Sequence, residues 1–130
     1  MVADLFHYGH VGMLRQAKEH GDYLLVGVHA DETVMSYKRR PILSMKERVA
    51  SVEGCRYVDE VVSNAPLTID RAWIERHNID LVLHGDDVSS EMEELWYKIP
   101  IEMGMYRSIG YTPGISTTDI IARIRAAEVD

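Results

Sequence analysis

The sequence predicts one α/β domain over residues 1–130, with a parallel sheet that carries helices on both faces. Compact apolar runs of strand length alternate with segments whose apolar residues recur at helical spacing. The helical segments are about ten residues long, which suits the crossover between two parallel strands. No linker or internal repeat divides the chain, and its length is sufficient to bury a core without disulfides.

The first expected element is an amphipathic helix that begins at the HYGH stretch, His7 to His10. Apolar residues three, four and seven positions after His10 continue one helical face, and Gly21 stands where a left-handed cap would end the helix. Both histidines then lie at the positive end of the helix. Three roles remain open for the pair: a metal site, packing in the core, or donation to a phosphate. The metal role is disfavoured because no HExxH or paired-cysteine spacing is present.

Four apolar or β-branched runs predict the strands of the sheet. They are Tyr23–His29, Tyr57–Val62, Ile79–Gly85 and Met103–Ile109. Because the segments between them are helical, the strands are expected to run parallel.

The remaining helices are predicted from their caps. S-x-x-E capping boxes predict helices that begin at Ser44 and Ser90, and Pro100 is expected to end the second of these. Thr68–His77 has a helical pattern, and Ser116 is expected to cap a last helix. HYGH, the HGDD stretch after the third strand and the GISTT turn should therefore meet at the carboxyl edge of the sheet, where such folds bind ligands.

Composition excludes several classes of protein. The net charge of −7 argues against a general nucleic-acid binder, because that binding needs many cations. No apolar run is long enough for membrane insertion, and no signal peptide is visible. The single cysteine, Cys55, fits a reducing cytoplasm and is expected to be a small buried residue.

Cations nevertheless gather in one short segment of this acidic chain. They are Lys38, Arg39, Arg40, Lys46 and Arg48. A solvated loop is the plain explanation, and a site for a small anion is the functional one.

Five motifs in order resemble those of the cytidylyltransferases that make CDP-alcohols, the group with choline-phosphate, ethanolamine-phosphate and glycerol-3-phosphate cytidylyltransferases. The motifs are DLFHYGH, SYKRRP followed by ER, RYVDEVV, HGDD and GISTTDII. The similarity runs from Ala3 to Ile124. It implies a Rossmann-like nucleotidyltransferase fold and transfer of CMP from CTP to a small phosphorylated alcohol. It also implies Mg²⁺ that accompanies CTP, and a homodimer.

The resemblance also implies the site residues. His7, His10 and Lys38 would be catalytic, and Lys38, Asp86 and Asp87 would bind the acceptor. The implied nucleotide-binding residues are Ala3, Asp4, Phe6, Gly9, Asp86, Thr112, Gly114, Ile115, Ser116, Thr117 and Thr118. Gly9 would let the triphosphate approach the backbone, and no metal held by protein ligands is expected.

The chain departs from the family pattern in three places. The family has a strand before its VADLFH-like segment, where only Met1 to Ala3 stand, so a central strand is expected to be missing. Tyr111 replaces an arginine that clamps phosphate. Leu67 and Ser90 replace the tryptophan and tyrosine of choline-specific relatives, which favours ethanolamine phosphate as acceptor. Two alternatives stay open: an adenylyltransferase that uses ATP, and a nucleotide-binding module without turnover.

Overall fold

The computed structural model describes residues 1–86, 88–110 and 112–127. Its helices are α1 (Tyr8–Lys18), α2 (Asp31–Met35), α3 (Met45–Glu53), α4 (Arg71–Arg76), α5 (Ser90–Glu102) and α6 (Thr117–Ala126). Its strands are β1 (Leu25–Val28), β2 (Glu60–Ser63), β3 (Val82–Gly85) and β4 (Tyr106–Ile109). Within the described residues, none of the helices has both the length and the apolar character that a membrane span requires.

The four strands form two separate parallel pairs. β1 pairs with β2 from Leu25 opposite Glu60, and β3 pairs with β4 from Val82 opposite Tyr106. The predicted parallel direction is confirmed. Within the described residues, however, β1 and β3 do not pair with each other.

Met1 marks the position between the two pairs. Its amino group donates to the Gly27 carbonyl at 2.6 Å, and its own carbonyl accepts from the His29 amide at 3.0 Å. Two bonds that flank Val28 in this way form the ladder pattern of a parallel neighbour. The Val28 carbonyl itself accepts from Ala65 on the β2 side, so Met1 lies along the opposite edge of β1.

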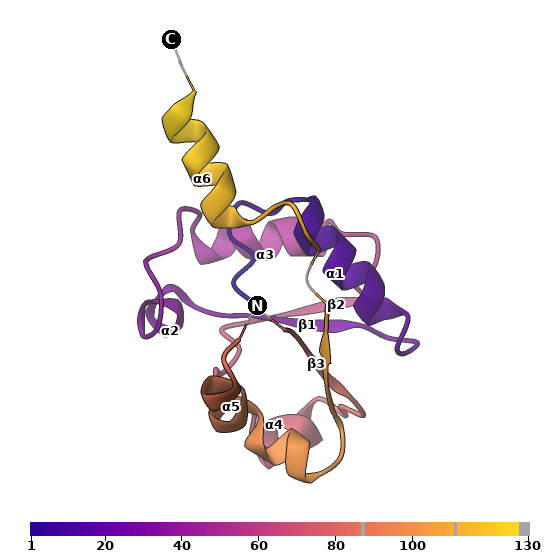
Figure 1. Cartoon of the computed structure of the whole chain (residues 1–130). Helices are drawn as coiled ribbons and strands as arrows, with labels where there is room; N and C mark the ends of the chain where they lie inside the picture. Colours follow the sequence, from indigo (N-terminus) through magenta and orange to yellow (C-terminus); the bar gives the residue numbers. More distant parts are fainter. Residues whose placement is uncertain (87, 111, 128–130) are drawn as a thin grey trace.

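The helices cover the strands from two sides (Figure 1). α1 and α3 lie on one side, α4 and α5 lie on the other, and α6 projects away from the body of the molecule. Each strand pair has its own core: Val28 and Val52 belong to the cluster under β1, and Ile74 and Trp96 belong to the cluster beside β3. A cavity of about 790 Å³ is lined by residues of both halves.

The prediction that Pro100 ends its helix was wrong. Pro100 lies inside α5, where Tyr97 has non-helical backbone angles (φ −117°, ψ 17°). Proline cannot donate to the carbonyl four residues earlier, which belongs to Trp96. The amide of Ile69 donates to that carbonyl instead, at 2.9 Å. A tertiary hydrogen bond therefore satisfies the group that the proline leaves without a partner, and the helix continues.

Three smaller predictions also need correction. Ser89, and not Ser90, caps α5, because its hydroxyl accepts from the Met92 amide. Gly21 is not a left-handed cap: α1 ends at Lys18, and its C-cap residue, Glu19, is in the right-handed region with φ −65°. The short helix α2 was not predicted. In contrast, the capping box at Ser44 and the cap of α6 by Ser116 are confirmed.

Candidate functional site

The two histidines of HYGH form the N-terminal cap of α1. The Nδ1 atom of His7 accepts from the Gly9 amide, and the Nδ1 atom of His10 accepts from the His7 amide, both at 3.0 Å. The ring centroids lie 3.9 Å apart. Since both Nδ1 atoms accept hydrogen bonds, each neutral ring carries its proton on Nε2. The cap therefore presents two N–H donors at a positive helix end.

Both rings are held in the neutral form. Burial, and to a smaller extent the adjacent His7 ring, lowers the pKa of His10 to about 4. Burial also lowers the pKa of His7. The Nε2 atom of His7 is buried and has no hydrogen-bond partner among the described residues. Buried polar atoms normally have partners, so an unpaired donor at this place suits a ligand that arrives with acceptor oxygens.

Gly9 has an intramolecular reason to be glycine. A Cβ atom there would lie 2.7 Å from Cε1 of His7 and 2.9 Å from Cγ2 of Ile115. The side chains of the cap and of the segment before α6 thus fill the space beside its backbone. The structure therefore accounts for Gly9 through the packing of His7, whereas close approach of a triphosphate remains a prediction.

The N-terminus of α6 lies against the segment before α1. The Thr117 hydroxyl donates to the Asp4 carbonyl at 2.9 Å, and the Thr112 hydroxyl donates to the Gly9 carbonyl at 3.3 Å. Ser116 uses its hydroxyl to accept from the Asp119 amide. These side chains hold the two helix N-termini together, so the free donors of α6 are its first backbone amides.

Residues 36–44, between α2 and α3, form a loop that we call the basic loop because it contains Lys38, Arg39 and Arg40. This loop borders the same cavity. Lys38 lines the cavity with its Nζ atom 5.6 Å from the centre of the Tyr37 ring. Among the described carboxylates, none lies within 4.0 Å of this Nζ atom. Arg39 is half exposed, 4.0 Å from the Asp4 carboxylate. Lys38 is therefore a cation that is available to an anionic ligand.

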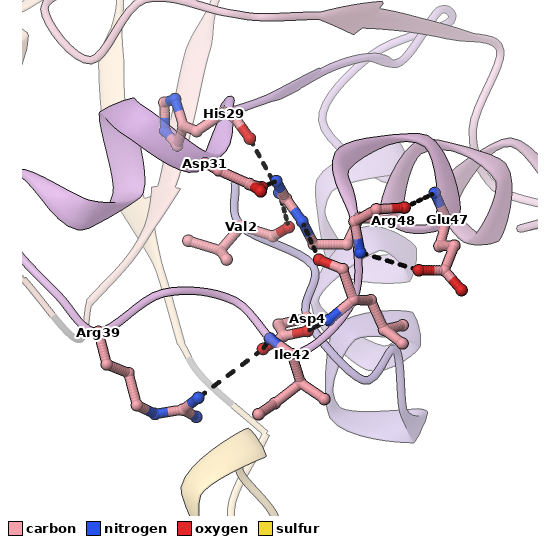
Figure 2. Close-up of polar contacts among 10 residues, drawn as sticks. Val2, Asp4, His29, Asp31, Arg39, Ile42, Glu47 and Arg48 are labelled. Carbon is pink, nitrogen blue, oxygen red and sulfur yellow. Dashed lines mark hydrogen bonds and ion pairs between the residues drawn. The ribbon is translucent and has the colours of Figure 1, made fainter.

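Arg48 holds the backbone next to the basic loop in place. Its side chain is completely buried and donates to the carbonyls of Val2, His29 and Leu43. It also pairs with Asp31 at 2.7 Å (Figure 2). Arg48 therefore acts as a local structural anchor. The positive charge that belongs to a ligand site is consequently that of the loop and not that of Arg48.

The cavity gathers many of the residues predicted for the site. Ala3, Asp4, His10, Lys38, Ser116, Thr117 and Thr118 line it. Phe6 stacks on the His10 ring at 5.3 Å, and Gly114 has the left-handed φ of +88° that favours glycine. Asp86 is exposed at the end of β3, next to the lining residue Gly85. Asp87 and Tyr111 lie outside the described residues.

One wall of the cavity was not predicted as part of the site. It is formed by apolar and aromatic side chains: Tyr37, Leu67, Val88, Met92, Trp96 and Tyr97. Trp96 and Tyr97 are buried and also line this cavity. An amphipathic helix pattern does not show which buried residues also border a cavity. Within the described residues, no three histidine, cysteine or carboxylate side chains gather as metal ligands would.

Comparison with known proteins finds relatives that are named as cytidylyltransferases. The ethanolamine-phosphate cytidylyltransferase of Dictyostelium discoideum is 45% identical over 126 residues, which cover 93% of this chain and 35% of that protein. The enzyme of the same name from Arabidopsis thaliana is 46% identical, with 95% and 31% covered. Human choline-phosphate cytidylyltransferase A is 44% identical, with 95% and 34% covered. The chain thus spans about a third of the length of these relatives.

A solved structure and a family model agree with these relatives. A lipopolysaccharide core biosynthesis protein from Thermoplasma volcanium GSS1 has the same fold, with a TM-score of 0.70 and 24% identity over 88% of this chain and 93% of that one. The family model described as cytidylyltransferase-like matches residues 2–123. The resemblance that the five motifs indicated is thereby confirmed. This chain therefore belongs to the cytidylyltransferase-like family.

Proposed function

We propose that this chain transfers CMP from CTP to ethanolamine phosphate. A phosphate oxygen of the acceptor attacks the α-phosphorus of CTP and forms the new P–O bond. The bond to the β-phosphate breaks at the same phosphorus, and pyrophosphate leaves with the electron pair. Because the nucleophile is already an anion, the enzyme needs no covalent intermediate, and its task is to position two anions and stabilise the developing charge.

One observation carries the proposal. The neutral His10 ring, the unpaired cation of Lys38 and the N-terminus of α6 border a single cavity in a molecule whose net charge is −7. Each of these groups donates to anions, and they come from distant parts of the chain. A triphosphate is the ligand that needs several donors spread over such a distance.

The donors divide the work by their chemistry. The Nε2–H groups of His7 and His10 are proposed to stabilise charge on the phosphates of CTP, as neutral donors that need not lose a proton at pH 7. Lys38 is proposed to hold the phosphates of both substrates, because a flexible ammonium can follow moving oxygens. Magnesium is proposed to arrive with CTP, since Mg²⁺ in such sites is bound largely by substrate phosphates.

The acceptor is proposed from the relatives and from the cavity wall. Relatives named for ethanolamine phosphate and for choline phosphate are both 44–46% identical to this chain in the cases given above. Leu67 lines the cavity where choline-specific relatives are expected to have tryptophan. With that part of an aromatic box absent, a primary ammonium is favoured over a trimethylammonium. Asp86 is proposed to contact the acceptor at the edge of the cavity.

Two further properties are proposed from the resemblance. The chain is proposed to act as a homodimer, which size-exclusion chromatography with light scattering measures. It is also proposed to work in the cytoplasm, which fits its one free cysteine, Cys55.

The test is pyrophosphate release from CTP and, separately, from ATP, with ethanolamine phosphate, choline phosphate and glycerol 3-phosphate as acceptors. We expect CTP with ethanolamine phosphate to give the highest kcat/KM. Lys38→Ala should lower this value by about two decades, the scale of one lost transition-state contact. The matched control is Lys46→Ala, an exposed lysine outside the cavity, which should keep the activity of the unaltered chain.

The gap between the strand pairs favours a second candidate, a module that binds CTP without turnover. Isothermal titration separates the two candidates. Heat of CTP binding together with product from none of the three acceptors would establish the module and overturn the transferase. A preference for ATP in both measurements would overturn the choice of donor.

A further inference from the structure

We propose that Asp4 is a positioning residue that fastens the basic loop to the backbone between Met1 and α1. This inference rests on the proposed function for its kinetic test and on geometry for everything else. The sequence suggested direct nucleotide binding for Asp4. Its carboxylate is instead occupied by the protein's own backbone, although the residue borders the cavity.

The carboxylate of Asp4 is almost fully buried and receives two amides of the loop. Oδ2 accepts from Ile42 at 2.8 Å, and Oδ1 accepts from Leu43 at 2.9 Å (Figure 2). Arg39 lies 4.0 Å from Oδ2 on the other side. Hydrogen bonds to an ionised carboxylate are among the strong ones in proteins. This contact therefore fixes the C-terminal end of the basic loop, which also contains Lys38.

The backbone around Asp4 is held in an unusual conformation. Ala3 and Leu5, on either side of Asp4, have φ values of +59° and +48°, in the left-handed region that side chains disfavour. Such strain persists only where neighbouring contacts hold it. The contacts here are the donation of Thr117 to the Asp4 carbonyl and that of Arg48 to the Val2 carbonyl.

Asp4 is therefore the point at which three elements meet. Its carboxylate binds the basic loop, its carbonyl binds the N-terminus of α6, and the strained backbone leads directly into the cap of α1. These are the elements that bring Lys38, the α6 amides and the histidines to one cavity. Loss of the carboxylate should release the loop while the helices stay in place.

The first test does not depend on activity. Trypsin cleaves after Lys38 and Arg39, so the rate of cleavage there reports opening of the loop. Asp4→Asn keeps the shape of the side chain and loses its charge, and we expect cleavage at these sites to rise about tenfold or more. The matched control is Asp59→Asn. Asp59 also accepts a backbone amide, that of Leu24, and pairs with Lys18, but these partners are not part of the loop and Asp59 does not line the cavity.

The second test is a double-mutant cycle in the pyrophosphate assay. If Asp4 acts through the loop, Asp4→Asn should lower kcat/KM by about a hundredfold in the unaltered chain and by at most about twofold when Lys38 is already alanine. A residue that only stabilises the fold, or that contacts CTP itself, would give the same loss in both backgrounds. Equal losses, or unchanged cleavage by trypsin, would overturn the proposal.

If Asp4→Asn does not fold, a second variant still tests the proposal. Thr117→Val removes only the hydroxyl that donates to the Asp4 carbonyl, and it should raise cleavage of the loop by a smaller factor than Asp4→Asn. If trypsin cleaves Thr117→Val at the same rate as the unaltered chain, the backbone around Asp4 does not help to hold the basic loop. Failure of the proposed function is distinguishable, because an inactive chain still gives a result in the trypsin test.

Discussion

Lowering the pH from 7 to 5 should destabilise the folded state of this protein. Burial lowers the pKa of His10 to about 4 and that of His29 to about 3, from an ordinary value of 6.5. Both histidines are about 6% exposed. Between the folded and unfolded pKa values the unfolded chain binds more protons, so the free energy of unfolding falls as the pH drops below 6.5. The loss continues until the folded pKa is passed.

The size of the loss follows from the two pKa values of each histidine. At a pH near 5 the unfolded histidines are almost fully protonated, and the folded ones remain almost fully neutral. Each then removes about 2 kcal/mol relative to neutral pH, since one pKa unit corresponds to about 1.4 kcal/mol. The two together remove about 4 kcal/mol. This is a large share of the free energy of unfolding of a typical domain, which is roughly 5–15 kcal/mol.

Urea unfolding at pH 7 and at pH 5, followed by circular dichroism, measures this difference. His10→Gln should reduce the pH-dependent loss by about half, because one of the two histidines with a large pKa shift is gone. His20→Gln is the matched control, since His20 is exposed at the end of α1 and its removal should leave the loss unchanged. If the unaltered chain and His10→Gln lose equal free energy between the two pH values, the assigned protonation of the site is wrong.

Four substitutions, one of them a control, test other features of the structure. Gly9→Ala should destabilise the fold by about 1–3 kcal/mol and weaken CTP binding, because its Cβ would push the His7 ring aside; thermal melts and titration measure both effects. Arg48→Ala should cost about 3 kcal/mol or more in urea unfolding, since it leaves one buried and two partly buried carbonyls without their donor. Gly114→Ala should cost about 1–2 kcal/mol because of its positive φ, whereas Gly21→Ala, with open space around it, should be close to neutral; equal losses would contradict this account.

Local chemistry explains which parts of the fold could be predicted from the sequence. The capping box of α3 needs only Ser44 and Glu47, and both of its hydrogen bonds form. The apolar runs likewise predicted the parallel strands. Pro100 was misjudged because the donor for the Trp96 carbonyl, Ile69, is distant in the sequence. A tertiary partner of this kind leaves no local signal.

The site was predictable to a similar degree. The meeting of the histidine cap with the start of α6 follows from the rule that parallel strands share a carboxyl edge. The role of Asp4 does not follow from it, because an aspartate beside HxGH can bind a ligand or a backbone amide equally well. The choice depends on the path of a loop nearly forty positions later, at Ile42 and Leu43. Only the folded chain shows that path.

The separation of the strand pairs decides how the two substrates could be aligned. His10 and Lys38 belong to the half that contains β1, and Thr117 is hydrogen-bonded to Asp4 of that half. Trp96 belongs to α5 in the half that contains β3. A direct contact between the halves at the cavity is the edge-on packing of Tyr37 against Trp96, with centroids 5.0 Å apart. Transfer between phosphates needs alignment to within about 1 Å, because misplacement of that size costs about a hundredfold in rate. Under the proposed function, the packing of Tyr37 against Trp96 is therefore one of the contacts that would keep the two substrates aligned.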